Sequence, residues 1–288
     1  MRDYRTDRID FASVEYPEKL RNIPRPPKQL YCAGDISLLH RKCVGIVGAR
    51  KHTIYGKNVA LMIGRRLGES GVPVVSGLAL GIDAFSHEGA LEAEGRVIGV
   101  LGSGINRMGP ARNRDLMMRG LEAGGLVVSE YGPDEDVCKG SFPARNRIIS
   151  GLSDAVVIVE AGMNSGSLIT AKHAADQGRT IYAVPGNINS QSSIGCNLLI
   201  RDGAVPLVIV DDLLRDIGEA SAARETAPSS LDGDEVRIYE TLAERSGATC
   251  EEIIAATGLG ASLVNSLITV MEIKGIVESY AGRIYITR

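Results

Sequence analysis

Short apolar runs, rich in β-branched residues, alternate with helical patterns from Cys43 onward, and this alternation constrains the fold more than any other feature. The runs are VGIV, VPVVS, RVIGVLG, GLVVSE, DAVVIVE, TIYAVP and PLVIV. Continuously apolar strands are typical of parallel sheets covered on both faces, and an intervening helix supplies the crossover. The sequence therefore predicts an α/β fold, a doubly wound Rossmann-like parallel sheet over about residues 43–215.

The two ends of the chain differ from this central region. Residues 1–42 include the Pro-rich stretch IPRPPKQLY, and we expect an N-terminal lead-in segment that packs against the sheet. Residues 216–232 are rich in Ala, Ser, Glu and Pro, which predicts a linker. Residues 233–288 carry three amphipathic helical patterns and end in the hairpin pattern IVESYAGRIYIT. They predict a small C-terminal winged-helix domain.

Composition excludes several classes of protein. The chain has 44% hydrophobic and 23% charged residues, which is ordinary for a soluble protein. No apolar run reaches about eighteen residues, and the start MRDYRTDRID lacks the apolar centre of a signal peptide, so we expect a cytoplasmic protein without membrane association. The five cysteines form no C-x-x-C pair and the four histidines lack metal-like spacing, so we expect no metal and no cofactor.

Charge is unevenly distributed along the chain. Residues 231–288 hold nine acids and five Lys or Arg, which leaves 26 acids and 27 bases of the totals of 35 and 32 for the rest. Between Lys139 and Arg147 there are three bases and no acid. Because salt screens charges beyond about 8–10 Å, such a local cluster decides phosphate binding more than the net charge of −3 does.

Glycine and serine dominate the loops that follow the predicted strands. In an open parallel sheet ligands bind beyond the carboxyl ends of the strands, where free backbone N–H groups at helix N-termini attract anions. Arg50 stands where a G-x-G-x-x-G fingerprint needs its second glycine, which disfavours a dinucleotide cofactor. The loops are 48–51, 76–83, 102–109, 129–132, 160–167 and 185–187.

The stretch SFPARNR combines an aromatic residue with bases. Pro143 suits the first turn of a helix, which would place Phe142 just before it and Arg145 to Arg147 inside that turn. At about 100° per residue the two arginines diverge, so we expect one to face a ligand and the other to anchor the loop. Phe142 can stack on a base for about 1–3 kcal/mol while a nearby cation holds its phosphate. The alternatives are a core role for Phe142 and a surface ion pair for Arg50.

Four titratable residues could form an enzyme site. Asp83 and His87 stand four residues apart on one helical face, and Glu130 and Glu160 end two strands. Such a group could transfer protons. A structural role is favoured, with Asp83 as a helix N-cap and the glutamates fixing loops.

The motifs together resemble those of the DNA-processing protein A family (DprA, also called Smf). The likeness extends from about Tyr16 to Asp212, and the tail resembles the winged helix of many members. Where the family usually reads G-L-D-x-x-Y-P, this chain has GINRMGP. The motifs that carry the resemblance are GIVGARK, YGKNVA, VVSGLALGIDAFSHEGAL, SFPARNRIISGLS, VVIVEAGMNSGSLITAKHAADQGR, VPGN and GCNLLIRDGA.

This resemblance implies a non-catalytic protein that binds single-stranded DNA, usually as a homodimer, and helps load the RecA recombinase during natural transformation. By resemblance the contacts would include Arg50, Lys139, Phe142, Arg145 and the helix start Ser165–Ser167, with Arg112 and Asn113 as a further phosphate contact. The full set of expected DNA-binding residues is Arg50, Lys51, Ser76, Gly77, Arg112, Asn113, Lys139, Phe142, Arg145, Asn146, Arg147, Ser165, Gly166, Ser167 and Lys172.

The competing enzyme class is that of nucleoside-monophosphate phosphoribohydrolases, which share this kind of sheet. Their P-G-G-x-G-T loop is followed closely by a catalytic glutamate, whereas this chain has no acid between Gly166 and Ala175.

The winged helix is not expected to be the main DNA-binding element, since ASLVNSLITVMEIKG offers no Lys or Arg before Lys274 and includes Glu272. We expect it to contact protein instead.

Overall fold

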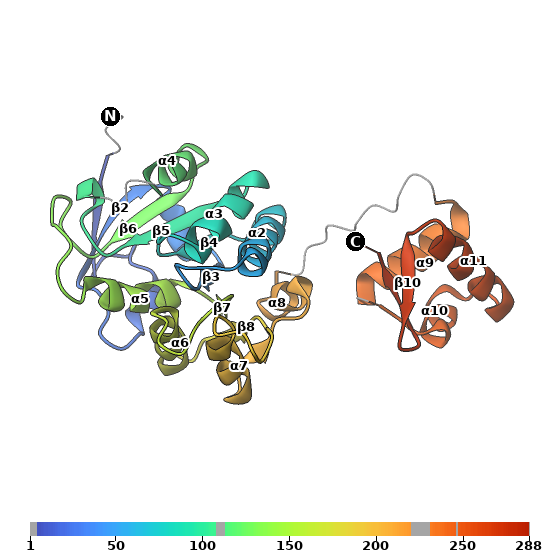
Figure 1. The fold of residues 1–288 in the computed structure, drawn as a ribbon. Coiled ribbons are helices and arrows are strands. Elements are labelled where there is room, and N and C mark those ends of the chain that lie inside the picture. Colours follow the sequence, from blue (N-terminus) through green and yellow to red (C-terminus); the bar gives the residue numbers. More distant parts are fainter. Residues whose placement is uncertain (1–4, 108–112, 220–230, 246, 288) are drawn as a thin grey trace. The chain divides into compact units, whose positions relative to one another are not determined.

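The structure, a computed structural model, describes residues 5–107, 113–219, 231–245 and 247–287. The chain forms two compact units, Met1–Ala220 and Ser221–Arg288 (Figure 1). Each unit has its own hydrophobic core and is described by itself. The predicted α/β class, with a mostly parallel sheet and a C-terminal winged helix, is confirmed.

The larger unit is built on a sheet in the order β1-β2-β6-β5-β4-β3-β7-β8-β9. From β6 to β9 all neighbouring strands are parallel, while β1 pairs with β2, and β2 with β6, in antiparallel fashion. The strands are β1 (Asp7–Asp10), β2 (Gln29–Gly34), β3 (Val44–Val47), β4 (Val74–Ser76), β5 (Val97–Leu101), β6 (Leu126–Ser129), β7 (Ala155–Ile158), β8 (Thr180–Ala183) and β9 (Val205–Pro206).

Two details differ from the sequence prediction. Residues 1–42 do more than pack against the sheet, because they supply its antiparallel edge, β1 and β2, together with the short helix α1 (Glu18–Arg21) and the 3-10 helix η1 (Ile36–His40). The run PLVIV is not a full strand: β9 ends at Pro206, and Val210 begins helix α8 (Val210–Asp216). Val210, Leu213 and Leu214 are buried in this helix, and their spacing of three and four residues is that of one helical face.

Helices cover both faces of the sheet (Figure 1). Within β7, Ala155 and Val157 belong to one core cluster while Val156 and Ile158 belong to the other, because successive strand residues point to opposite faces. Helices α2 (Ile54–Glu69), α3 (Ile82–Glu92) and α8 cover the first face. Helices α1, α5 (Ser141–Leu152), α6 (Ser167–Asp176) and α7 (Ile194–Arg201) cover the second. The 3-10 helix η2 (Ile105–Arg107) and helix α4 (Arg114–Glu122) accompany β5 and β6.

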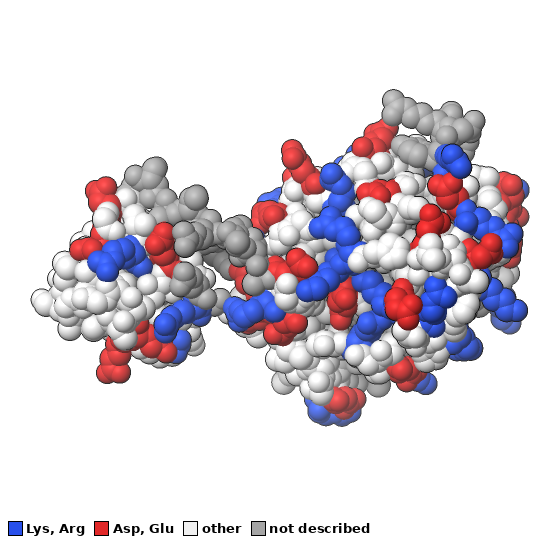
Figure 2. All heavy atoms as spheres, turned by 180° about the vertical axis from the view of Figure 1, so that it is seen from behind, with Lys and Arg blue, Asp and Glu red and all other residues white. Residues whose placement is uncertain are grey.

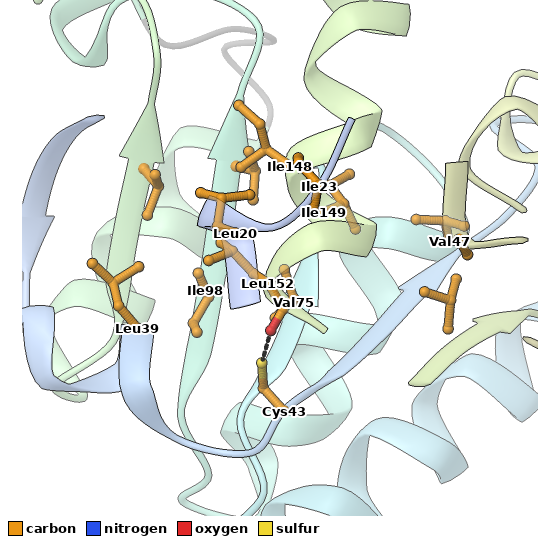
Figure 3. Close-up of a cluster of buried hydrophobic side chains, with 14 of the residues drawn as sticks. Leu20, Ile23, Leu39, Cys43, Val47, Val75, Ile98, Ile148, Ile149 and Leu152 are labelled. Atoms are coloured by element: carbon orange, nitrogen blue, oxygen red, sulfur yellow. Dashed lines mark hydrogen bonds between the residues drawn. The ribbon is translucent and has the colours of Figure 1, made fainter. Parts of the chain in front are cut away.

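Helix α5 is held firmly against the sheet. Figure 3 shows Ile148, Ile149 and Leu152 among core side chains, with the Cys43 Sγ–H donating to the carbonyl oxygen of Leu152 at 2.9 Å. A Cβ on Gly151 would lie 2.6 Å from the side chain of Leu20, so helices α1 and α5 approach closely there. This anchoring fixes the first turn of α5 beyond the carboxyl ends of the strands.

The smaller unit contains α9 (Gly233–Arg245), α10 (Cys250–Thr257), α11 (Ala261–Ile273) and the antiparallel hairpin of β10 (Val277–Tyr280) and β11 (Arg283–Ile286). The N-terminus of α10 has a capping box, in which Thr249 and Glu252 exchange side chain to backbone hydrogen bonds. Among the described helices, none is long and apolar enough to cross a membrane alone. Only α10 and α11 taken together pass such a test, with a bend of 114° between them.

Candidate functional site

A cavity of about 680 Å³ lies where the order of the sheet reverses, between β3 and β7. From β3 the chain proceeds outward through β4, β5 and β6, and it then returns to the other side of β3 as β7. The loop after β3, the loop after β7 and the first turns of α5 and α6 line this cavity. Such a switch point is where open α/β sheets place their ligands, because the loops on either side diverge there.

Surface charge is mixed elsewhere on this unit. Figure 2 shows Lys and Arg side chains lying among Asp and Glu on one face of the larger unit, whereas much of the visible surface of the smaller unit carries neither. Ion pairs such as Arg65 with Glu92 and Arg66 with Asp211 account for several of the arginines. Among the described residues, Arg50 and Lys51 are exposed bases of the cavity lining for which neither an ion pair nor a hydrogen bond is formed.

Phe142 lies in the cavity beside Arg50. The guanidinium carbon of Arg50 is 5.7 Å from the centre of the Phe142 ring, and Phe142 is 42% exposed, so the core alternative for this ring does not hold. Helix α5 begins at Ser141 after Gly140, which has φ of 93°, so Phe142 lies within the first turn and not before it. Pro143 still falls in the first turn, where its missing N–H leaves no hydrogen bond unmade.

Arg145 points into the protein beneath the cavity. It is 4% exposed, and its Nη1 donates to the carbonyl oxygens of Gly77, at 2.6 Å, and Val100. Burial lowers the pKa of Arg145 to about 10, partly offset by Asp83. A Cβ on Gly77 would lie 2.6 Å from the guanidinium, so Gly77 leaves room for this side chain. Arg145 and Gly77 therefore support the cavity floor.

Arg147 also serves as an anchor. Its Nη2 forms an ion pair with Glu130 at 2.6 Å, and its Nε donates to the carbonyl oxygen of Arg25 at 3.0 Å. The expectation that one arginine of this pair faces a ligand and the other anchors a loop stays a prediction: Arg147 is an anchor, and Arg145 lines the cavity although its Nη1 donates to backbone carbonyl oxygens. Only Arg145 reaches the cavity lining.

Two other predicted positions, Ser76 and Asn113, lie outside the lining of this cavity. The Ser76 hydroxyl is fully buried and donates to the carbonyl oxygen of Ile46 at 2.6 Å. Asn113 is 7% exposed, and its Nδ2 donates to the carbonyl oxygen of Leu78 at 2.8 Å. Arg112 lies outside the described residues. Ser76 and Asn113 are therefore placed to fix the strand ends.

The start of α6 forms the opposite wall. Ser165 and Ser167 share a hydrogen bond between their hydroxyls at 2.7 Å, and Gly166 between them is exposed, with nothing within 4 Å of a Cβ placed on it. Asn146 Nδ2 donates to the carbonyl oxygen of Gly166 at 3.3 Å and so joins α5 to α6. Lys139 and Lys172 are exposed near these two helices but outside the lining.

The four titratable residues considered for proton transfer do not assemble into one site. Glu160 is 2% exposed and accepts from Thr53 N at 2.9 Å and Thr53 Oγ1 at 2.6 Å, so it fixes the start of α2, while Glu130 pairs with Arg147. Asp83 accepts from Gly77 N at 3.1 Å, and burial raises its pKa despite Arg145. Asp83 lies inside the first turn of α3, where Gly81 is the N-cap, so the N-cap prediction is wrong by two residues.

Burial also shifts the pKa values of His87 and Cys196, two further groups that could react. It lowers the pKa of His87 to about 4 and raises that of the Cys196 thiol to about 12. Within the described ranges no group of three or more His, Cys, Asp or Glu side chains is placed to hold a metal ion. The sequence reasoning missed Asn164, which lines the cavity just before Ser165. Its place in a loop after a strand was the available signal.

The fold and the cavity define a class of protein. Its members have a Rossmann-like unit, a winged-helix unit, and basic side chains without ion pairs at the switch point of the sheet. Residues 7–218 match the family model of DNA recombination-mediator protein A, and residues 222–283 match that of the DprA winged helix domain. The chain therefore belongs to the DNA recombination-mediator protein A family, which confirms the resemblance seen in its motifs.

Curated relatives cover most of the chain. Protein Smf of Escherichia coli is 36% identical over 265 residues, which are 85% of this chain and 71% of the relative. The DNA processing protein DprA of Bacillus subtilis is 39% identical over 212 residues, 73% of this chain and 71% of the relative.

Two solved structures share the fold. The X-ray structure of DprA from Streptococcus pneumoniae has a TM-score of 0.68 and 37% identity and covers 75% of each chain. DprA from Helicobacter pylori, whose structure is described as showing a single-stranded DNA binding mode, has a TM-score of 0.67 and 30% identity, covering 75% of this chain and 97% of that one.

Proposed function

We propose that this protein is a recombination mediator that binds single-stranded DNA in the cavity at the switch point. The observation that carries the proposal is that Arg50, whose charge no ion pair neutralises among the described residues, lies beside the exposed ring of Phe142. The Arg50 guanidinium carbon is 5.7 Å from the centre of that ring. Proteins usually bind a single strand with basic side chains that hold its phosphates and with neighbouring aromatic rings that stack on its nucleobases. The related protein from Helicobacter pylori is described as binding single-stranded DNA, which supports the same ligand here.

The residues divide into those that meet the strand and those that hold the site. Arg50 and Lys51 attract phosphates, Phe142 stacks on a base, and the N-terminus of α6 at Ser167 adds the positive end of a helix dipole. Arg145 acts as a positioning residue from below. A nucleobase can reach a ring at the wall of a cavity only when it is unpaired, which favours single strands over duplex.

The proposed cellular role takes its support from the family. We infer that the protein protects incoming single-stranded DNA and helps load RecA during natural transformation, and that it acts as a homodimer without catalysis; family membership supports each of these points. The hydrolase alternative has less support. Asp83 is the only acid among the described lining residues of the cavity, and it is buried against Gly77 and Arg145.

Fluorescence anisotropy with oligo-dT and with a duplex of equal length tests the ligand. We expect tighter binding of the single strand, with a log–log salt slope of about −0.7 for each phosphate neutralised. A slope near zero, or a preference for duplex, would contradict the proposal. Release of free base from nucleoside monophosphates at enzymatic rates would favour the hydrolase.

Two further measurements test the cellular role. The purified protein should accelerate RecA filament formation on single-stranded DNA, and an unchanged rate would count against RecA loading. Light scattering should give twice the mass of one chain, and a monomer over the whole concentration range would count against the homodimer.

A further inference from the structure

A second cavity, of about 290 Å³, lies on the other side of Arg50. Its walls come from the loop between β3 and α2, from α3, and from the first turns of α4. The side chains that define its chemistry are Arg50, His52, Phe85, Glu88, Asp115 and Arg119. None of these except Arg50 lines the first cavity.

The two cavities share one wall. Ala79 lines the first, Leu80 and Gly81 line the second, and Arg50 lines both. Gly81 has φ of 87°, and a Cβ there would lie 2.4 Å from the carbonyl oxygen of Ala49, so only glycine allows the two loops to touch. Ile82 N donates to the same oxygen at 3.3 Å. The wall is therefore a fixed pair of backbone segments with the Arg50 side chain shared between the two sides.

Aromatic and basic groups meet in the second cavity as they do in the first. His52 and Phe85, which both line this cavity, are packed edge to face with ring centres 4.7 Å apart. Lys57, outside the described lining, has its Nζ 5.1 Å from the centre of the Phe85 ring. Arg119 is exposed, and among the described residues its side chain forms no ion pair and no hydrogen bond. A DNA strand that leaves the first cavity across Arg50 would thus meet a second set of aromatic rings and basic side chains.

The second cavity differs from the first in its acids. Glu88 and Asp115 are in its lining, whereas the first cavity has only the buried Asp83 among its described lining residues. Carboxylates repel phosphate but accept hydrogen bonds from amino groups. Cytosine and adenine carry an exocyclic amino group on their pairing edges, and so does guanine, whereas thymine does not. The acids therefore suit the edge of an amino-bearing base.

We propose that the second cavity is a further nucleotide subsite for the same strand, which takes an amino-bearing base beside Glu88 and Asp115 while Arg50 and Arg119 hold the flanking phosphates. The proposal rests on single-strand binding at the first cavity and adds to it a second contact and a base preference. Glu88 and Asp115 accept from the amino group, and His52 offers a ring to the face of the base.

The base preference is tested by anisotropy with oligo-dC and oligo-dT of equal length at slightly alkaline pH, where cytosine is unprotonated. We expect the parental protein to bind oligo-dC at least about tenfold tighter, because one hydrogen bond to a charged group contributes about 1.5–3 kcal/mol. Glu88→Leu combined with Asp115→Ala removes both carboxylate acceptors and should remove most of this preference. Equal affinity of the parental protein for the two oligonucleotides, or a preference that survives the double substitution, would overturn the proposal.

The phosphate contact is tested with two arginines of the same helix. Arg119→Ala should weaken single-strand binding and reduce the salt slope by about 0.7. Arg114→Ala is the matched control, because Arg114 is also exposed on α4 but lies outside the described lining of both cavities. Circular dichroism establishes that both variants are folded. If Arg119→Ala behaves like the control, the second subsite is wrong.

These outcomes separate the two proposals. If the parental protein does not bind single strands, the proposed function itself fails. If Arg50→Ala and Phe142→Leu weaken binding while the base preference and the Arg119 effect are absent, single-strand binding stands and only the second subsite is rejected.

Discussion

A double-mutant cycle on Arg50 and Phe142 tests the first cavity most directly. Arg50→Ala should reduce the salt slope by about 0.7, because it removes one phosphate contact. Phe142→Leu should leave the slope unchanged, since stacking releases no counterions, and should weaken binding by about 1–3 kcal/mol, roughly 5- to 150-fold. Phe142 is 42% exposed, so its replacement should leave the fold intact.

The geometry also predicts that the two substitutions are not additive. The guanidinium of Arg50 lies 5.7 Å from the centre of the Phe142 ring, within the range of a cation–π contact worth about 0.5–1 kcal/mol at an exposed site. Replacing the Phe142 ring therefore removes the cation–π contact that helps to hold the Arg50 guanidinium where it can bind a phosphate. The double variant should lose less affinity than the sum of the single variants, by about that amount.

The assay is a fluorescence anisotropy titration of a labelled oligo-dT at several salt concentrations, for the parental protein, both single variants and the double variant. Additivity within about 0.3 kcal/mol would show that the ring and the guanidinium act independently. Parental affinity in both folded single variants would refute the placement of the strand in this cavity. An equal loss of slope in Phe142→Leu and Arg50→Ala would refute the division of roles.

Three further predictions concern stability and the smaller unit. Gly77→Ala should lower the free energy of unfolding in urea by about 1–3 kcal/mol, because its Cβ would lie 2.6 Å from the Arg145 guanidinium; unchanged stability would mean that Arg145 moves aside freely. The folded-state pKa of His87, about 4, lies below its unfolded value of about 6.5, so the unfolded chain binds the extra proton. Stability should therefore fall as pH drops through this window, by up to about 3 kcal/mol, and a His87→Leu variant with the same acid sensitivity would contradict this cause. Truncation after residue 219 should leave affinity for single-stranded DNA near the parental value, because Lys274 of the winged helix is paired with Glu235; a tenfold loss would show direct contact.

The sequence by itself determined the fold class and the loops that carry the site. Strand and helix periodicity are local properties, so the apolar runs that became β3 to β8 and the helices between them could be predicted from their own residues. The rule that ligands lie beyond the carboxyl ends of parallel strands then selected the loops containing Arg50 and Ser165. Both residues line the cavity.

Only the tertiary structure decided which side chains within those loops face outward. Arg145 and Arg50 look equivalent as sequence, yet β4, β5 and α5 converge around Arg145 and bury it, while Arg50 stays exposed. The edge strand β2 pairs with β6, a contact between segments far apart in the chain that no local pattern specifies. The second cavity likewise exists because α3 and α4 come together beside Arg50. Burial and pairing of this kind depend on long-range packing, and packing is a property of the assembled elements and not of any one segment.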